Sequence, residues 1–180
     1  MRNASQRYVA FLRGVSPMNA KMPELTRAFE AAGFADVKTV LGTGNIVFSA
    51  KPTALPALAK QCEAAMQKTL GSSFFTLVRS VDELTQLLNE NPLAGFRLPR
   101  GSKRVITFLA KRPRPAPKLP IELNGARILT LRDNTVFSTY IPSPQAPVFM
   151  SLLERTFGKT ITTRTWETVA RCIKKAELER

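Results

Sequence analysis

The feature that most restricts the fold is a short pattern that occurs twice along the chain. Residues 45–49 read NIVFS and residues 134–138 read NTVFS, while VAFL at 9–12 has a counterpart in ITFL at 106–109. The matches keep the same order in both halves, and each lies in a segment whose apolar residues indicate a strand. A repeat with preserved order is typical of a duplicated structural unit. The 180 residues therefore predict two units of similar fold.

Apolar periodicity and turn residues predict the elements of the first unit. Strands are expected at residues 7–13, 37–41, 46–49 and 74–78, and helices at 23–32 and 55–70. Pro23 fits the first turn of its helix, while Gly33 and Gly71 are placed to end the two helices in the left-handed conformation. The resulting order, β-α-β-β-α-β, is that of the ferredoxin-like plait. The predicted fold class is α+β, with duplicated ferredoxin-like subdomains.

Three parts follow from this interpretation: a first ferredoxin-like subdomain at residues 1–79, a connecting helix at 80–92, and a second, shorter-looped subdomain at 93–180. Ser80 and Glu83 form a capping box at the start of the connecting helix. In the second subdomain, the proline-rich segment KRPRPAPKLP replaces the first helix with an extended loop. A C-terminal helix runs from Trp166 to about Ala176, with Thr165 as its N-cap and the tryptophan buried.

Three motifs stand apart along the sequence: LRGV at residues 12–15, GNIVF at 44–48 and TTR at 162–164. In this order they resemble an uncharacterised bacterial family, domain of unknown function 1697 (DUF 1697). The resemblance covers nearly the whole chain and implies a pair of ferredoxin-like subdomains, in agreement with the periodicity. The family has no established activity, so the resemblance assigns no catalytic residue.

Residue counts exclude several classes of function. The sequence contains no histidine and only two cysteines, Cys62 and Cys172. Ser–His–Asp triads, histidine-ligated metals and haem, zinc knuckles and disulfide frameworks are therefore excluded. Both cysteines lie on or beside apolar helix faces and are expected to fill the core. We expect no metal and no cofactor, and the sequence leaves open whether the protein is an enzyme.

The sequence shows neither a signal peptide nor a membrane-spanning helix, and the cellular compartment is predicted from this. The N-terminal residues carry charge without the apolar core of a signal peptide. No segment approaches the roughly 18 apolar residues that a membrane helix requires. We therefore expect a cytoplasmic protein with no membrane partner.

Polar residues near two element ends form a candidate site for a small anion. The candidate ligand-binding residues are Arg13, Asn19, Lys21, Asn45, Thr163 and Arg164. The first three lie between the first strand and the first helix, whereas Thr163 and Arg164 precede the last helix, whose N-terminus favours anions. The alternative is structural. The arginines would then pair with backbone carbonyls or with carboxylates such as Glu24 or Glu167, and Asn45 would relieve a positive φ in a hairpin.

Basic residues exceed acidic ones by 14, and residues 101–180 carry +9 of this excess. The candidate nucleic-acid-binding residues are Lys103, Arg104, Lys111, Arg112, Arg114 and Lys118. The last four lie on the proline-rich loop, where we expect no neighbouring carboxylate. Such a field attracts phosphate backbones, so the leading hypothesis is sequence-independent binding of a polyanion such as nucleic acid.

Two alternatives remain open from the sequence. The protein could be a small phosphate- or carboxylate-ligand protein, or an enzyme, that uses the loops after the first strand and before the last helix. It could also be a protein-interaction module in which the proline-rich loop docks a partner, although the sequence names no protein partner.

Overall fold

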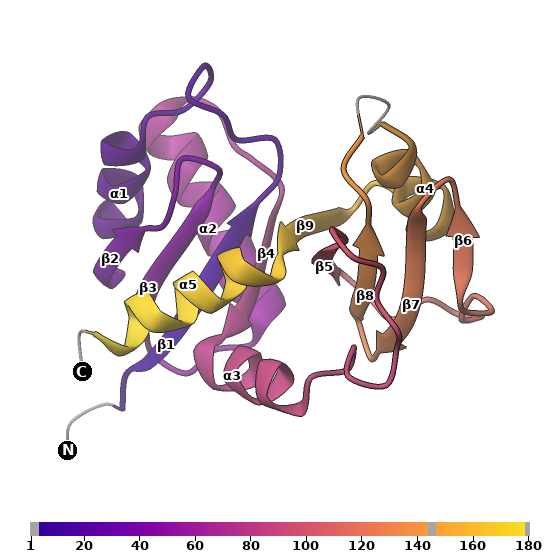
Figure 1. Cartoon of the computed structure of the whole chain (residues 1–180). Coiled ribbons are helices and arrows are strands. Elements are labelled where there is room, and N and C mark those ends of the chain that lie inside the picture. The colour runs from indigo at the N-terminus through magenta and orange to yellow at the C-terminus, as the bar shows by residue number, and fades with distance from the viewer. Residues whose placement is uncertain (1–3, 144–146, 179–180) are drawn as a thin grey trace. The chain divides into compact units, whose positions relative to one another are not determined.

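Figure 1 shows the computed structural model, which describes residues 4–143 and 147–178. The fold is mixed α+β, with two antiparallel sheets and five helices in the described residues. By their contacts, residues up to Gln86 and from Val169 onward form one compact unit (unit 1), and Leu87–Thr168 form a second (unit 2). No helix in this part of the chain combines the length and the apolar content needed to cross a bilayer.

The sheet of unit 1 has four strands in the order β2-β3-β1-β4, and all neighbouring strands are antiparallel. The strands are β1 (Gln6–Leu12), β2 (Ala35–Thr39), β3 (Asn45–Ala50) and β4 (Thr76–Ser80). Helix α1 (Met22–Ala31) connects β1 to β2, and α2 (Leu55–Leu70) connects β3 to β4. The predicted order of elements is present. Strand β4 begins two residues later than predicted, and Phe74 packs against the core just before it.

One face of this sheet packs against α1 and α2. Tyr8, Ala10 and Leu12 alternate along β1 and point to this side, where they belong to the main core cluster of the unit. At the centre of the cluster, the ring centroid of Phe48 lies 5.7 Å from that of Tyr8 and 5.6 Å from that of Phe29. This aromatic contact fixes helix α1 on the sheet.

The opposite face of the unit 1 sheet carries Val9 and Phe11, which are fully buried. Helix α5 (Trp166–Glu177) lies across this face in Figure 1, and its residues from Val169 onward group with unit 1. The sequence assigns the whole last helix to the second subdomain. From Val169 onward, however, the helix groups with unit 1. Val169 and Cys172 are fully buried on the helix face that covers the sheet.

The sheet of unit 2 has five strands in the order β6-β7-β8-β5-β9. The strands are β5 (Lys103–Leu109), β6 (Ile121–Leu123), β7 (Ala126–Arg132), β8 (Thr135–Tyr140) and β9 (Ile161–Thr165). Helix α4 (Pro147–Phe157) covers one face, where Phe149, Leu152 and Leu153 pack with Val105 and Leu109 of β5. The proline-rich segment between β5 and β6 forms no helix or strand, as predicted, but the chain bends at residues 110–111, 114–115 and 119, so it is not the uniformly extended loop that the sequence predicts.

Both passages between the units lie within helices. Helix α3 (Val81–Glu90) contains the boundary after Gln86, and α5 contains the boundary after Thr168. At the start of α3, the amide of Glu83 donates to the Ser80 hydroxyl at 3.1 Å, as the predicted capping box requires.

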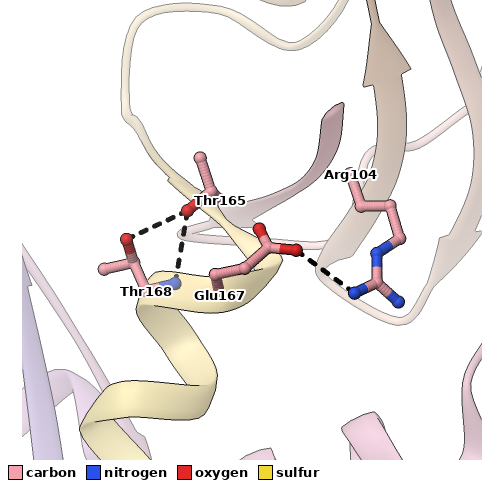
Figure 2. Close-up of polar contacts among 4 residues, drawn as sticks. All are labelled: Arg104, Thr165, Glu167 and Thr168. Atoms are coloured by element: carbon pink, nitrogen blue, oxygen red, sulfur yellow. Dashed lines mark hydrogen bonds and ion pairs between the residues drawn. The ribbon is translucent and has the colours of Figure 1, made fainter. Parts of the chain in front are cut away.

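The start of α5 agrees with the prediction from sequence. The Thr168 amide donates a hydrogen bond to the Thr165 hydroxyl at 3.2 Å, which confirms the N-cap (Figure 2). The first helical residue, Trp166, is 8% exposed, as expected for a core side chain. Its ring centroid lies 6.4 Å from that of Phe137 on β8.

Candidate functional site

The loop between β1 and α1 is held together by Asn19. Its side-chain nitrogen donates to the Gly14 carbonyl at 2.7 Å, and its side-chain oxygen accepts the Ser16 amide at 2.8 Å. Both polar groups of this side chain therefore serve the loop itself. Arg13 lies half-buried at the start of the loop, and Lys21 is exposed at its end, before the first turn of α1.

Asn45 also serves the backbone. The side chain is fully buried, and its nitrogen donates to the Val40 carbonyl at 2.9 Å and to the Thr43 hydroxyl at 3.2 Å. The preceding Gly44 has φ 84°, and a Cβ there would lie 3.0 Å from the Cβ atoms of Leu12 and Val15. Gly44 carries the positive φ, whereas Asn45 does not, so the expectation that Asn45 relieves a positive φ is wrong. Asn45 serves the turn through its hydrogen bonds, which is still a structural role.

The residues before the last helix form a strand and not the predicted loop. Thr163 pairs with Thr107 in β9 and β5, and Arg164 pairs with Ile106. Because adjacent strand residues point to opposite faces, Thr163 and Arg164 do not form one cluster. The Thr163 hydroxyl lies 3.1 Å from the Thr107 hydroxyl, and Arg164 Nη1 donates to the Thr163 carbonyl at 2.8 Å.

A second unit of similar fold predicts a strand after its helix, but the sequence does not show that this strand continues to Thr165, because no turn residue separates it from the helix that follows. Thr165 ends β9 and is also the N-cap of α5. Arg13 belongs to unit 1 and Arg164 to unit 2, so the two candidate loops do not share one compact unit.

Arg104 forms a local clasp at the start of β5 and α5. Its Nη2 atom lies 3.2 Å from Glu167 Oε1 (Figure 2), and its guanidinium carbon lies 4.7 Å from the centroid of the Trp166 ring. Glu167, considered from sequence as a partner of Arg164, has this ion pair with Arg104. The neighbouring Lys103 is exposed. The pairing of β5 with β9 brings these residues together, so the contacts cannot be predicted from local sequence patterns.

The side chains of Lys111, Arg112, Arg114 and Lys118 are exposed on the loop between β5 and β6. The expectation that this loop has no neighbouring carboxylate is wrong for Arg112, whose Nη1 atom lies 3.6 Å from Asp133 Oδ1. Asp133 occupies the tight turn between β7 and β8, and antiparallel pairing brings that turn beside the end of β5. This long-range contact cannot be read from local sequence.

Three connections of unit 2 meet at one end of its sheet. Phe108 pairs with Thr135 and Leu109 with Ile161, so the β7–β8 turn and the α4–β9 turn both lie where β5 ends and the proline-rich loop begins. The α4–β9 turn contributes the exposed Lys159. The basic end of unit 2 comprises Lys111, Arg112, Arg114, Lys118 and Lys159. Lys103 and Arg104 lie at the opposite end of β5, roughly 20 Å away at the rise of an extended strand.

Unit 2 contains 13 Lys and Arg residues but only five Asp and Glu residues. Four of those carboxylates form ion pairs with arginines: Glu90 with Arg132, Glu122 with Arg127, Asp133 with Arg112 and Glu167 with Arg104. Within the described residues, Lys111, Arg114, Lys118 and Lys159 form no ion pair. The basic end therefore keeps most of its positive charge uncompensated.

Two further polar groups are buried in unit 1. Cys62 is fully buried, and desolvation, with the nearby charge of Glu63, raises the pKa of its thiol well above the ordinary value. Arg79 is 4% exposed. Burial lowers the pKa of its guanidinium, while the Glu83 carboxylate, 3.9 Å away, acts in the opposite direction. The sequence predicted the core role of Cys62. It gave no sign of Arg79, which lies in an apolar strand segment.

A family model described as Protein of unknown function (DUF1697) matches residues 5–136, about three quarters of the chain. The chain belongs to the DUF1697 family. The match includes the LRGV and GNIVF motifs and ends before the TTR motif at residues 162–164. No curated protein matched the sequence of this DUF1697 protein.

Among solved structures, this DUF1697 chain is similar to the conserved bacterial protein SP0830 from Streptococcus pneumoniae. The two share 16% sequence identity with a TM-score of 0.71, and the comparison covers 97% of this chain and 99% of the other. At this level of identity the similarity shows a shared fold.

Proposed function

We propose that this DUF1697 protein binds the phosphate backbone of nucleic acid, without sequence specificity, through the basic end of unit 2. The observation that carries the proposal is an exposed loop on which Lys111, Arg114 and Lys118 have no ion pair within the described residues. Cations in such positions can neutralise phosphates and release condensed counterions, which supplies most of the free energy of non-specific binding.

The composition of the loop should reduce the conformational entropy that the loop loses when it binds. Pro113, Pro115 and Pro117 lie among the cations and fix φ at three positions of the loop. At the end of the loop, Leu119 packs against the core of unit 2. A loop that is already restricted by prolines and anchored loses less conformational entropy when it binds a phosphate backbone.

The same residues support recognition of the backbone over recognition of bases. Residues 110–120 contain only lysine, arginine, proline, alanine and leucine. The loop has no amide side chain to read adenine and no aromatic side chain on which a base could stack. Binding through this loop should therefore tolerate any sequence.

The test is a titration of a fluorescent 20-base-pair duplex at several salt concentrations. The variant carries Lys111→Ala, Arg112→Ala and Arg114→Ala. If all three residues reach phosphates, the slope of log affinity against log salt should fall by about two to three units. The matched control removes three exposed lysines of unit 1, Lys51, Lys60 and Lys68, which changes the net charge by the same amount.

Equal loss of affinity in both variants would assign binding to net charge and contradict a specific role for the loop. Absence of binding by the folded wild-type protein at low salt would contradict the proposal as a whole. The rival small-anion hypothesis predicts that Arg13→Ala or Arg164→Ala abolishes phosphate binding, while the loop variant behaves as wild type.

We also infer that the two units are copies of one ferredoxin-like plait. The order β2-β3-β1-β4 in unit 1 corresponds to β7-β8-β5-β9 in unit 2, with β6 added at the edge. The strands β2 and β3 form a hairpin in unit 1, as β7 and β8 do in unit 2, and in each unit a helix leads into the last strand. Superposition of the β2–β3 and β7–β8 hairpins in an experimental structure should align β1 with β5. Failure of these strands to align would contradict the duplication.

A further inference from the structure

Unit 2 contains a cavity of about 230 Å³ between its sheet and the first turn of α4. It is lined by Val105 of β5, Tyr140 of β8, Phe149 and Met150 of α4, and residues 163–165 of β9. The cavity is open to solvent on one side and is therefore a surface pocket and not an interior void. An apolar cavity of about 150 Å³ is sufficient to hold benzene, so this one has room for a ring with a substituent.

The wall of the cavity is flat, aromatic and well supported. The rings of Tyr140 and Phe149 stack with centroids 4.8 Å apart and an interplanar angle of 15°. Val105, which is 2% exposed, belongs to the core of the unit beside them. These side chains offer apolar area with little freedom to collapse into the space.

Met150 lies on the solvent side of the cavity and is 38% exposed. Its side chain is unbranched and rotates about three bonds, so it can move without disturbing the packing of α4. The buried Phe149 next to it keeps the first turn of the helix on the sheet. A ligand can therefore enter past Met150 while the aromatic wall stays in place.

The polar groups at the cavity are hydroxyls. The Thr163 and Thr165 hydroxyls are already hydrogen-bonded to those of Thr107 and Thr168, whereas the Tyr140 hydroxyl has no partner within the described residues. The β5–β9 register places the side chain of Arg164 on the opposite face of the sheet from Thr163. The lining thus favours a molecule with one uncharged polar group.

We infer that this cavity binds a small, uncharged aromatic molecule that carries one hydroxyl group, of the phenol class. The site is independent of the basic end and of the nucleic-acid proposal. The aromatic body lies against Tyr140, Phe149 and Val105, and the ligand hydroxyl is within the region served by the Tyr140 and threonine hydroxyls.

The probe is p-cresol, followed by the methyl NMR signals of protein labelled with ¹³C at the methionine methyl groups. The Met150 signal should shift saturably, with a Kd on the order of 0.1–1 mM for a ligand of this size. The Met18 signal should stay in place, because this residue belongs to unit 1, is 94% exposed and does not line this cavity. p-Toluate, which has the same ring but carries a carboxylate, should bind at least tenfold more weakly.

Two variants fill the cavity from different sides. Met150→Trp fills it from the solvent side, and Val105→Phe fills it from the sheet. Each should weaken p-cresol binding at least tenfold, whereas Met18→Trp should not change it. Because Met150 is partly exposed, its variant is expected to fold, and the amide spectrum checks this. The inference is overturned by a Met150 signal that does not move up to 10 mM p-cresol, by equal shifts at Met18, by tighter binding of p-toluate, or by full affinity in folded Met150→Trp.

Discussion

Asp133 is the carboxylate of the basic end, and its contact with Arg112 ties the proline-rich loop to the β7–β8 turn. The two side chains are 59% and 91% exposed, for Arg112 and Asp133 respectively. An ion pair that is this exposed contributes between about 0 and 1 kcal/mol to stability, so a phosphate can replace the carboxylate at little cost. Asp133 thus competes with the proposed ligand.

Asp133→Asn should raise the affinity for duplex DNA about two- to fivefold at low salt. The substitution removes a negative charge beside the proposed phosphate site, and asparagine tolerates the positive φ of 50° at this position. The free energy of unfolding should change by less than about 0.5 kcal/mol. Anisotropy titration of the two proteins, with urea unfolding as a control for fold, measures both effects. A lower affinity would show that Asp133 orients Arg112 productively.

Gly44→Ala should destabilise the protein by about 1–3 kcal/mol, because alanine is strained at φ 84° and its Cβ would crowd Leu12 and Val15. Gly42→Ala is the matched control in the same turn. A Cβ at Gly42 meets no atom within 4 Å, and its φ is not in the left-handed region. Urea unfolding of both variants measures the difference. Equal stability of the two would contradict the structural role assigned to this turn.

At the scale of elements, helices and sheet pairings differ in how well local sequence predicts them. Helix α2 begins and ends where apolar spacing and Gly71 predict, because both signals are local. The duplication predicts a strand after the helix of the second unit, but residues 162–164 are interpreted from sequence as a loop, because the extent of β9 depends on pairing with β5, whose partners lie more than 50 residues earlier. A structural role of Asn45 in its turn is one of two options predicted from sequence, although hydrogen bonds to Val40 and Thr43, and not a positive φ, define that role.

Trp166→Ala should cost roughly 3–5 kcal/mol of unfolding free energy, as large-to-small changes in a core do. The side chain is 8% exposed, lies near Phe137 and carries the guanidinium of Arg104 over its ring. Denaturant unfolding followed by circular dichroism measures the loss. In the wild-type protein, Trp166 is the only tryptophan, so its fluorescence should be blue-shifted and poorly quenched by iodide. Strong quenching in the native state would place the ring in solvent.

The buried faces of α2 and α5 each carry a cysteine, and neither should react in the folded protein. Cys62 and Cys172 are fully buried, and the raised pKa of Cys62 keeps its thiol protonated at pH 8. A chromogenic disulfide reagent should therefore label both thiols only after unfolding. Rapid labelling of either residue under native conditions would show that its helix opens locally.

At the scale of the whole molecule, the net charge can be calculated from the sequence, but the positions of the charged side chains on the folded protein cannot. The chain contains no histidine, so no ordinary side chain titrates between pH 5.5 and 7. The affinity for duplex DNA at fixed ionic strength should therefore change less than twofold over this range, as titrations at both pH values can check. A larger change would point to a carboxylate with an unusual pKa near the ligand.

The positions of the predicted cations cannot be obtained from the sequence in the same way. Only the strand register shows that they divide between the two ends of β5.

Because unit 2 interrupts unit 1, the order of synthesis has a consequence for folding. The sheet of unit 1 is complete once β4 has left the ribosome, yet the helix that covers Val9 and Phe11 follows unit 2 in the chain and is made after it. During translation, that apolar surface therefore stays uncovered while all of unit 2 is synthesised. The nascent chain must therefore avoid aggregation with one face of its first sheet exposed, until α5 has been synthesised and packs on that face.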